Sequence, residues 1–361
     1  MYQYVIKKDN QHSQSIFLTE SEVAIIIKNW LRLTYINWGW IDDFNKIITK
    51  YVESCVYILI DPFRKHHVKY FKKLKVFKGH LDQINNVQFS PNGKFLVSCS
   101  WDKTIRMWDI ASSKEIQRFE GHTSYVTSAQ FSSDNSKILS CSRDQTIRLW
   151  DVTSGQQKHL FQGHSNIVTG IQFSSNGKKI LSWSWDKTIR IWDVETGKEL
   201  HKVRLAVPFI TEAQFLSDDL SVILCSSDKT IRIWDIISGQ IVQKLDNLLG
   251  VVTRSRFSID CSKILLWSED NTIRIFNVNT SNEVQIFKGH LKAVTAVQFS
   301  PDCKTVVSSS EDNTIRIWDV TSGQETQKLA GQSTLIRGLQ FSPDGNTFIS
   351  WPCEKKIQLW G

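Results

Sequence analysis

The sequence predicts an all-β fold in which seven four-stranded sheets close into a ring, a seven-bladed β-propeller, preceded by a small N-terminal α-helical hairpin. The first observation behind this prediction is a repeat, because one aromatic position recurs every 42 residues. Its members are Trp108, Trp150, Trp192, Trp234, Phe276, Trp318 and Trp360. The second is the alternation of apolar and polar residues in each copy, and the third is the turn signals that separate these runs.

Each copy contains four short apolar runs. The first two are separated by a turn signal such as Pro91 to Gly93, and the last two by one such as Thr153 to Gly155. Four short strands in 42 residues make one propeller blade. Seven copies in register predict seven blades.

Two dipeptides mark the complete copies, as Gly121-His122 before a first strand and Trp150-Asp151 at the end of a third strand. At this spacing they resemble the WD-repeat family, in which the G-protein β-subunit has seven blades. The resemblance covers the chain from about Phe71 to Gly361. It implies a non-catalytic scaffold or adaptor that binds other proteins and requires no cofactor.

The chain is predicted to have two parts. Residues 71–361 form the propeller, and residues 1–70 form a helical extension with a basic linker. Thr19 and Glu22 have the spacing of a capping box, a helical period follows, and a second helical face begins after Gly39. The hairpin is either a small domain that packs on the propeller or an element for dimerisation or adaptor function.

Residues 71–78 are predicted to be the closing strand of the ring. The seventh copy reaches Trp360 and Gly361 at the end of its third strand, and Leu74 to Phe77 has the pattern of a fourth strand. Pairing these segments would complete the seventh blade and cover an open sheet edge.

Four copies contain His, Ser and Asp, the residue types of a nucleophilic triad. Four equivalent sets do not fit an enzyme, which needs one set beside an oxyanion site. We therefore predict no catalytic residue, and the resemblance implies that each set joins its Trp in a buried hydrogen-bonded tetrad. The tetrads are His80, Ser98, Asp102 and Trp108; His122, Ser140, Asp144 and Trp150; His164, Ser182, Asp186 and Trp192; and His290, Ser308, Asp312 and Trp318.

The remaining copies depart from this pattern. The fourth and fifth copies have apolar residues at both the His and the Ser positions, namely Ala206 and Leu224, and Leu248 and Leu266. An orphaned buried polar group costs about 1–3 kcal/mol, whereas replacing both partners is nearly neutral, so joint loss favours a structural role. In the seventh copy Gln332, Ser350, Glu354 and Trp360 are predicted to form a modified network.

The resemblance also indicates a binding face. In the family, partners dock on the narrow face of the ring through turn residues near the tetrads. Trp, Tyr and Arg dominate interface energies, and these positions are rich in aromatic residues in the first four copies. The predicted partner-binding residues are Trp101, Tyr125, Arg143, Ile167, Trp185, Phe209 and Arg337. The alternative is that some of them merely cover the central channel.

Two other functions compete with a scaffold. One is a substrate receptor of a ubiquitin ligase, but the hairpin shows no F-box pattern, and the Trp-Asp pairs lack the Arg that follows in ligase-recruited members. The other is binding of nucleic acid or acidic lipid through residues 64–78, where much of the net charge of +8 lies. A solvated linker and a protected edge strand explain these Lys and Arg residues as well.

Composition bounds the cellular context. The chain has 7 Cys spread over 361 residues and no targeting signal, so free thiols are predicted rather than disulfides. No Cys or His spacing fits a metal site. No apolar run is long enough to span a bilayer. We therefore expect a cytoplasmic or nuclear protein that is not secreted.

Overall fold

The computed structural model describes residues 70–205, 209–228, 230–245, 252–268, 270–280, 282–330 and 334–361. The chain divides into two units between His67 and Val68, and the described residues all belong to the second unit. The predicted hairpin and nearly all of the linker before Tyr70 lie outside the described residues. Those two parts, and the boundary at residue 70, stay predictions.

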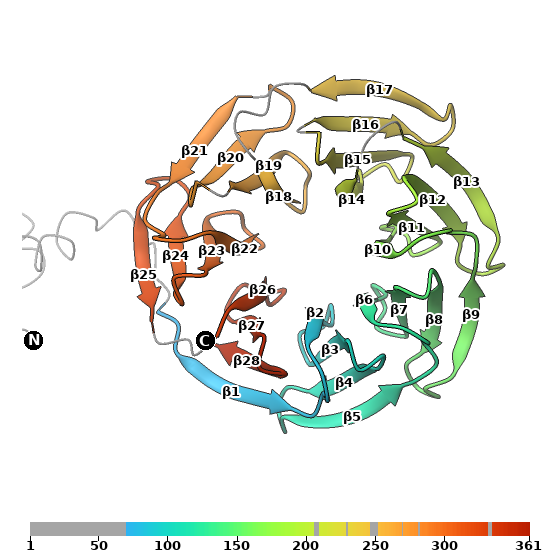
Figure 1. Cartoon of the computed structure of the whole chain (residues 1–361), viewed down its shortest axis with the longest axis horizontal. Coiled ribbons are helices and arrows are strands. Elements are labelled where there is room, and N and C mark those ends of the chain that lie inside the picture. Colours follow the sequence, from blue (N-terminus) through green and yellow to red (C-terminus); the bar gives the residue numbers. More distant parts are fainter. Residues whose placement is uncertain are drawn as a thin grey trace, which may run out of the picture. The chain divides into compact units, whose positions relative to one another are not determined.

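The described residues form seven four-stranded antiparallel sheets, which lie side by side in a ring (Figure 1). The prediction of an all-β seven-bladed propeller is thereby confirmed. Blades 1 to 3 contain β2 (Ile84–Phe89), β3 (Phe95–Ser100), β4 (Ile105–Asp109), β5 (Lys114–Phe119); β6 (Val126–Phe131), β7 (Lys137–Ser142), β8 (Ile147–Asp151), β9 (Gln157–Phe161); and β10 (Val168–Phe173), β11 (Lys179–Ser184), β12 (Thr188–Asp193), β13 (Glu199–Arg204).

The other four blades repeat this order from the inner to the outer strand. Blades 4 and 5 contain β14 (Ile210–Phe215), β15 (Ser221–Ser226), β16 (Ile231–Asp235), β17 (Gln240–Leu245); and β18 (Val252–Phe257), β19 (Lys263–Ser268), β20 (Ile273–Asn277), β21 (Glu283–Phe287). Blades 6 and 7 contain β22 (Val294–Phe299), β23 (Thr305–Ser310), β24 (Ile315–Asp319), β25 (Glu325–Leu329); and β26 (Ile336–Phe341), β27 (Phe348–Pro352), β28 (Lys356–Trp360) with β1 (Lys73–Lys78).

The seventh blade combines the two ends of the described chain. Strand β1 pairs antiparallel with β28, with Phe77 opposite Ile357, and Lys72 and Gly361 exchange two backbone hydrogen bonds of 3.1 and 3.0 Å. The ring of Phe71 packs 5.0 Å from that of Phe348. The outer edge of β28 is therefore paired rather than exposed to other chains.

The hydrophobic core lies between neighbouring blades. Trp150 of blade 2, for example, belongs to one buried cluster with Val97, Ile105 and Phe119 of blade 1. Phe77 of the closing strand likewise joins a cluster with residues of blade 1. Each blade therefore buries its apolar face against the next one, as expected when stability comes from neighbour contacts.

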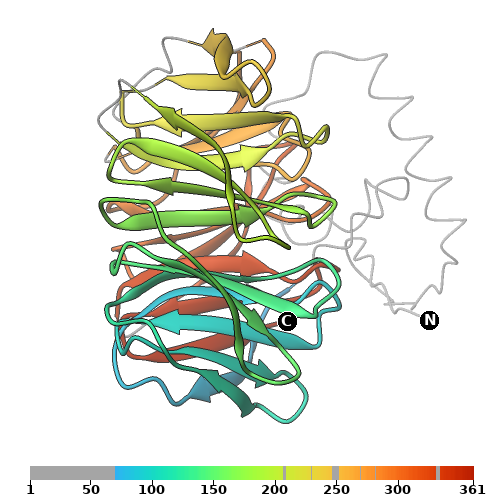
Figure 2. The same cartoon turned by 90° about the vertical axis from the view of Figure 1, so that its right-hand side faces the viewer.

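The ring has two faces, because each antiparallel strand runs from one to the other (Figure 2). We call the face that carries the turns between the second and third strands of each blade the top face. The connections between blades also lie there. The turns between the first and second strands, and between the third and fourth, lie on the bottom face.

The six described cysteines have free thiols, and Cys55 lies outside the described residues. Burial raises the pKa of Cys141 to about 12 despite a hydrogen bond with Thr127, so this thiol stays protonated and unreactive at neutral pH.

Candidate functional site

The four predicted tetrads are hydrogen-bonded chains in the structure. In blade 1, Trp108 Nε1 lies 2.8 Å from Ser98 Oγ, which lies 2.7 Å from His80 Nε2. His80 Nδ1 lies 2.8 Å from Asp102 Oδ2. The same bonds, all between 2.7 and 3.0 Å, occur in blades 2, 3 and 6.

Donor chemistry fixes the direction of each chain. The indole N–H of Trp108 can only donate, so Ser98 Oγ accepts from it and gives its own hydrogen to His80 Nε2. His80 Nδ1 then carries the ring hydrogen and donates to Asp102. With this assignment, every buried side-chain polar atom of the His80–Ser98–Asp102–Trp108 tetrad has a hydrogen-bond partner.

Burial and charge reinforce this assignment. Burial lowers the pKa of His80 against the opposing effect of Asp102, so the imidazole is neutral at pH 7. Burial alone would raise the pKa of Asp186, but hydrogen bonds from Thr188 and His164 bring it down to about 2. Each chain therefore joins a neutral imidazole to an ionised carboxylate.

The tetrads lie out of reach of a substrate. Their serines all have an exposed fraction of 0%, namely Ser98, Ser140, Ser182 and Ser308. Each hydroxyl is also held between an indole and an imidazole. These groups can tie the top-face turns to the third strand of a blade, whereas a nucleophile needs access to a reacting carbonyl.

Packing explains the Gly of the Gly-His dipeptide. A Cβ on Gly79 would lie 2.8 Å from Cη2 of Trp108, and one on Gly121 would lie 2.7 Å from Nη1 of Arg148. The third-strand Trp and Arg thus cover the backbone beside the His, and only Gly leaves room for them.

Blades 4 and 5 both lack the hydrogen-bonded tetrad, but in different ways. In blade 5 the residue at the third-strand Trp position is Phe276, so this position has no indole N–H that needs a partner. Blade 4 keeps Trp234, whose buried Nε1 has no hydrogen-bond partner among the described residues, because Leu224 stands at the Ser position. Blade 4 has thus lost both the His and the Ser of the tetrad but has kept the Trp. Its Asp228 instead accepts a 2.7 Å hydrogen bond from Arg232.

Blade 7 keeps part of the network, since Trp360 Nε1 donates to Ser350 Oγ over 2.9 Å. Gln332 lies outside the described residues, and Glu354 forms an ion pair with Lys356. The Trp360–Ser350 hydrogen bond of the predicted network is therefore present, and the part that involves Gln332 stays a prediction.

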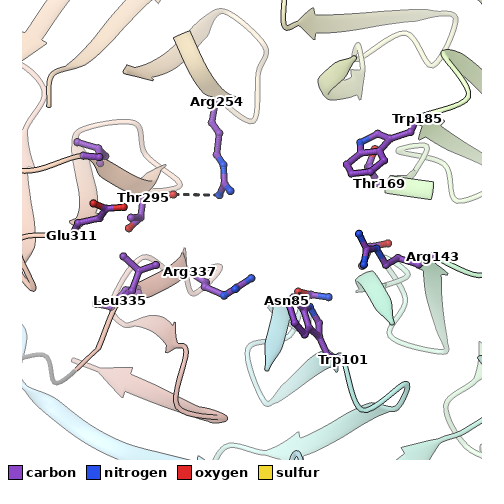
Figure 3. A pocket seen from close by; sticks show the side chains of 14 residues that line it. Asn85, Trp101, Arg143, Thr169, Trp185, Arg254, Thr295, Glu311, Leu335 and Arg337 are labelled. Atoms are coloured by element: carbon purple, nitrogen blue, oxygen red, sulfur yellow. Dashed lines mark hydrogen bonds between the residues drawn. The ribbon is translucent and has the colours of Figure 1, made fainter. Parts of the chain in front are cut away.

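A cavity of about 810 Å³ opens at the centre of the top face. Four predicted binding-face residues line it, namely Trp101, Arg143, Trp185 and Arg337 (Figure 3). The predicted residues Tyr125, Ile167 and Phe209 lie outside its lining. The cavity also contains Arg254, which sequence reasoning missed. The only signal was a charge at a strand position where other copies have small, amide or acidic residues.

Four predicted face residues of blades 7, 1 and 2 contact one another in a row. The guanidinium carbon of Arg337 lies 5.3 Å from the ring centroid of Trp101. Trp101 stacks on Tyr125 at 4.9 Å with an interplanar angle of 6°, and Arg143 lies 5.6 Å from the centre of Tyr125. We call these four side chains the cation–aromatic row. Cation–π and stacking contacts hold it in one arrangement.

Asn85 fixes the centre of this row. Its Oδ1 accepts a 2.7 Å hydrogen bond from Trp101 Nε1, and its Nδ2 donates over 2.7 Å to the carbonyl of Val126 in the next blade. Its own carbonyl accepts from Trp351 of blade 7. This position therefore links three blades and positions the indole.

The second aromatic pair is more open. Trp185 is 43% exposed and Phe209 49% exposed, and their rings lie 5.9 Å apart at 57° across the boundary between blades 3 and 4. Ile167 lies beside them half-buried, and its carbonyl accepts from the backbone of Trp185. This pair offers free aromatic surface on the top face.

Geometry also bears on metal, membrane and polyanion binding. Within the described ranges, no group of three or more His, Cys, Asp or Glu residues could hold a metal ion. The same ranges contain no helix long and apolar enough to cross a membrane. Two basic residues of the closing strand contact the propeller, since Lys75 Nζ donates to the backbone carbonyls of Ile110 and Ala111 and Lys73 Nζ lies 5.5 Å from the ring centre of Trp360.

The ring of Trp-Asp blades and the repeated tetrads define a repeat propeller of one particular class. The family model described as "WD domain, G-beta repeat" matches residues 71–109, 113–151, 155–193, 208–235 and 281–319. The chain belongs to this WD-repeat family.

Two curated relatives each match the chain over about one repeat. The chain is 46% identical over 41 residues to human WD repeat-containing protein 36. It is 44% identical over 39 residues to a Ribosome biogenesis protein BOP1 homolog of Drosophila melanogaster. Each match covers 11% of this chain and 5% of the relative, so the comparisons support the repeat family.

Proposed function

We propose that this propeller is a non-catalytic scaffold or adaptor that holds partner proteins on its top face. The observation that supports this function best is the exposed pair Trp185 and Phe209. Large aromatic groups left open to water beside a cavity are typical of interaction surfaces and of the residues that dominate binding energy. Membership of a repeat family of interaction modules agrees with this proposal.

The proposed binding face consists of the residues singled out by sequence. They are Trp101, Tyr125, Arg143, Ile167, Trp185, Phe209 and Arg337. Trp101 and Tyr125 are held by contacts within the protein, whereas Trp185 and Phe209 have open ring surface. We therefore assign the anchor role to the second pair and a supporting role to the first.

A double substitution tests the face. Replacing Trp185 and Phe209 together by Ala should abolish capture of the proteins that co-purify with the intact chain, because each anchor contributes roughly 2 kcal/mol or more. The matched control is Ile237→Ala, since Ile237 is 72% exposed but lies in the turn between β16 and β17 on the bottom face. Capture that survives the double substitution, or fails equally in the control, would contradict this assignment.

The non-catalytic part has its own test. A Ser-directed fluorophosphonate should label none of the tetrad serines, because their hydroxyls are buried and already hydrogen-bonded. Mass spectrometry of the treated protein measures the labelling at each site. Stoichiometric labelling of Ser140, for instance, would show that it acts as a nucleophile.

We infer a cytoplasmic or nuclear address from the free thiols. Six described cysteines without a disulfide suit a reducing compartment. Imaging of a fluorescent fusion in the cells that make the protein tests this address, and a signal in the secretory pathway would contradict it.

A further inference from the structure

The top-face cavity carries positive charge that the described residues leave uncompensated. Three Arg residues line it, Arg143, Arg254 and Arg337, against one carboxylate, that of Glu311, so the lining has an excess of positive charge. The bonds that the Arg side chains make are weak. Arg254 donates to the carbonyl of Thr295 over 3.4 Å, and Arg337 Nε lies 3.4 Å from Cys353 Sγ. None of the three forms an ion pair with a described acidic residue.

The ring itself brings these charges together. Arg143 lies in the turn between β7 and β8 of blade 2, Arg254 lies on β18 of blade 5, and Arg337 lies on β26 of blade 7. Figure 3 shows the three side chains extending into the same space from different sides. No single segment of the chain could produce this arrangement.

Like charges held together are costly without a counterion. Partial removal from water, together with the charge of Arg337, lowers the pKa of Arg254 below its usual value, although the group stays charged at neutral pH. A bound anion would relieve the repulsion between these two groups. The cavity is therefore electrostatically prepared for a negative ligand.

Two of the three Arg side chains are also held in place. Arg337 and Arg143 form the ends of the cation–aromatic row, and Asn85 fixes the Trp101 indole at its centre. Groups already ordered in the free protein lose little freedom when a ligand binds. Guanidinium groups present paired N–H donors that match the oxygens of carboxylate and phosphate.

We propose that this cavity binds an anionic group, carboxylate or phosphate, carried by an extended segment of a partner protein, with the guanidinium groups of Arg143, Arg254 and Arg337 as its donors. This inference rests on the proposed scaffold function and specifies the chemistry of the partner. At about 810 Å³ the cavity is large enough for several residues of a chain. The exposed ring of Trp185 lines the cavity. It can therefore contact an apolar residue next to the charged residue of the partner segment.

Defined peptides test the chemistry directly. Calorimetric titration of the full chain with tetraglutamate, with a phosphoserine tetrapeptide and with tetraglutamine should show binding of the first two and none of the third. Replacing Arg254 and Arg337 together by Gln should weaken the anionic peptides by more than about tenfold, because each lost charge-assisted hydrogen bond lowers affinity. Arg254→Lys, which keeps the charge, should retain part of the affinity. The two anionic peptides show whether carboxylate or phosphate is preferred.

A matched control removes an equal charge elsewhere. Arg204→Gln changes an exposed Arg on β13, outside the cavity, and should leave peptide affinity unchanged. If the cavity variants bind the anionic peptides as well as the unaltered chain does, the anions bind elsewhere on this basic protein and the proposal is wrong. Tighter binding of an oligothymidylate than of either peptide, lost in the same variants, would also overturn it. The single variant Arg254→Gln repeats the test with one exposed side chain if the double variant does not fold.

Partner capture separates this inference from the scaffold function. If the Arg254 and Arg337 variant captures partners normally while the Trp185 and Phe209 variant does not, the top face is the docking surface and the anion site is refuted. If neither variant changes capture, the proposed binding face itself is wrong. Loss of capture in both supports the two proposals together.

Discussion

Blades 2 and 4 have the same four strands but satisfy their aromatic position differently. In blade 2, Trp150 Nε1 donates to Ser140 over 2.8 Å, and the chain continues through His122 to Asp144. In blade 4, the equivalent Trp234 is equally buried, but its Nε1 has no hydrogen-bond partner among the described residues. The propeller blade therefore tolerates the loss of the polar chain but retains the packing of the indole.

The difference also changes how the Asp in the turn between the second and third strands is used. Asp144 is 2.7 Å from His122, whereas Asp228 of blade 4 pairs with Arg232, at 2.7 Å. Apolar packing builds both blades, since Trp150 and Trp234 each belong to a core cluster. The tetrad therefore adds a second set of constraints to a fold that the inter-blade core already specifies.

The largest effect should follow from giving blade 2 the Leu of blade 4. Ser140→Leu would leave His122 and Trp150 without their shared partner, and two orphaned buried groups cost about 2–6 kcal/mol together. Denaturant unfolding measures the change. If the free energy of unfolding fell by less than about 1 kcal/mol, the tetrad would contribute little to the stability of blade 2. Blade 2 would then tolerate the loss of its tetrad as blade 4 does.

A smaller loss is expected for His122→Ala. Removing the imidazole orphans Ser140 and Asp144 in part and should lower the free energy of unfolding by about 1–3 kcal/mol. Partner capture at a permissive temperature should persist, because His122 is buried away from the proposed binding face. A neutral change would show that the imidazole has no structural role.

Matched Trp→Phe substitutions sharpen the comparison. Trp150→Phe removes a donor and leaves Ser140 without it, whereas Trp234→Phe removes an N–H that already lacks a partner. The loss of ring volume is the same in both, so the difference between the two unfolding free energies isolates the hydrogen bond. We expect Trp150→Phe to be more costly by about 1–2 kcal/mol. Equal costs would mean that Trp234 finds a partner in solution.

The repeat could be predicted from sequence because the same residue types recur at the same positions of each copy. The spacing of the Trp position, the Gly-His and Trp-Asp pairs and the turn signals are enough to count the blades. The polar chains followed from residue types that complete one another's hydrogen bonds, as His80, Ser98 and Trp108 do.

The top-face cavity could be predicted only in part. Trp101, Arg143, Trp185 and Arg337 were found through repeat positions, but their arrangement depends on the angle between blades. Arg254 was missed because it lies on an inner strand, where alternation alone does not show which side chains converge across the ring. The cation–aromatic row joins three blades, and no pattern within one repeat encodes it.

The tetrad blades should lose stability as the pH falls below neutrality. Burial lowers the pKa of His122 in the folded state, so the unfolded chain binds more protons once the pH falls below about 6.5. The free energy of unfolding should therefore decrease between pH 7 and pH 5. For one His the slope is at most about 1.4 kcal/mol per pH unit. In His122→Ala the decrease should be smaller, and an identical profile would show that this imidazole titrates normally.

Glu212 of blade 4 should have the opposite effect, since it should make the protein less stable as the pH rises. This is the smallest effect that we expect. Burial of Glu212 raises its pKa to about 7, against the opposing charge of Arg256, whose Nε lies 3.8 Å away. Once the pH rises above about 4.5, the ordinary pKa of a Glu, the carboxyl of Glu212 is ionised in the unfolded chain but still protonated in the folded one. The free energy of unfolding therefore falls as the pH rises towards 7. Because Glu212 keeps some contact with water, the contribution is about 1 kcal/mol. Glu212→Gln should remove this fall and stabilise the protein slightly at pH 8, as measured by unfolding at several pH values. A variant that is less stable than the unaltered chain at pH 8 would instead show that ionised Glu212 and Arg256 form a favourable pair.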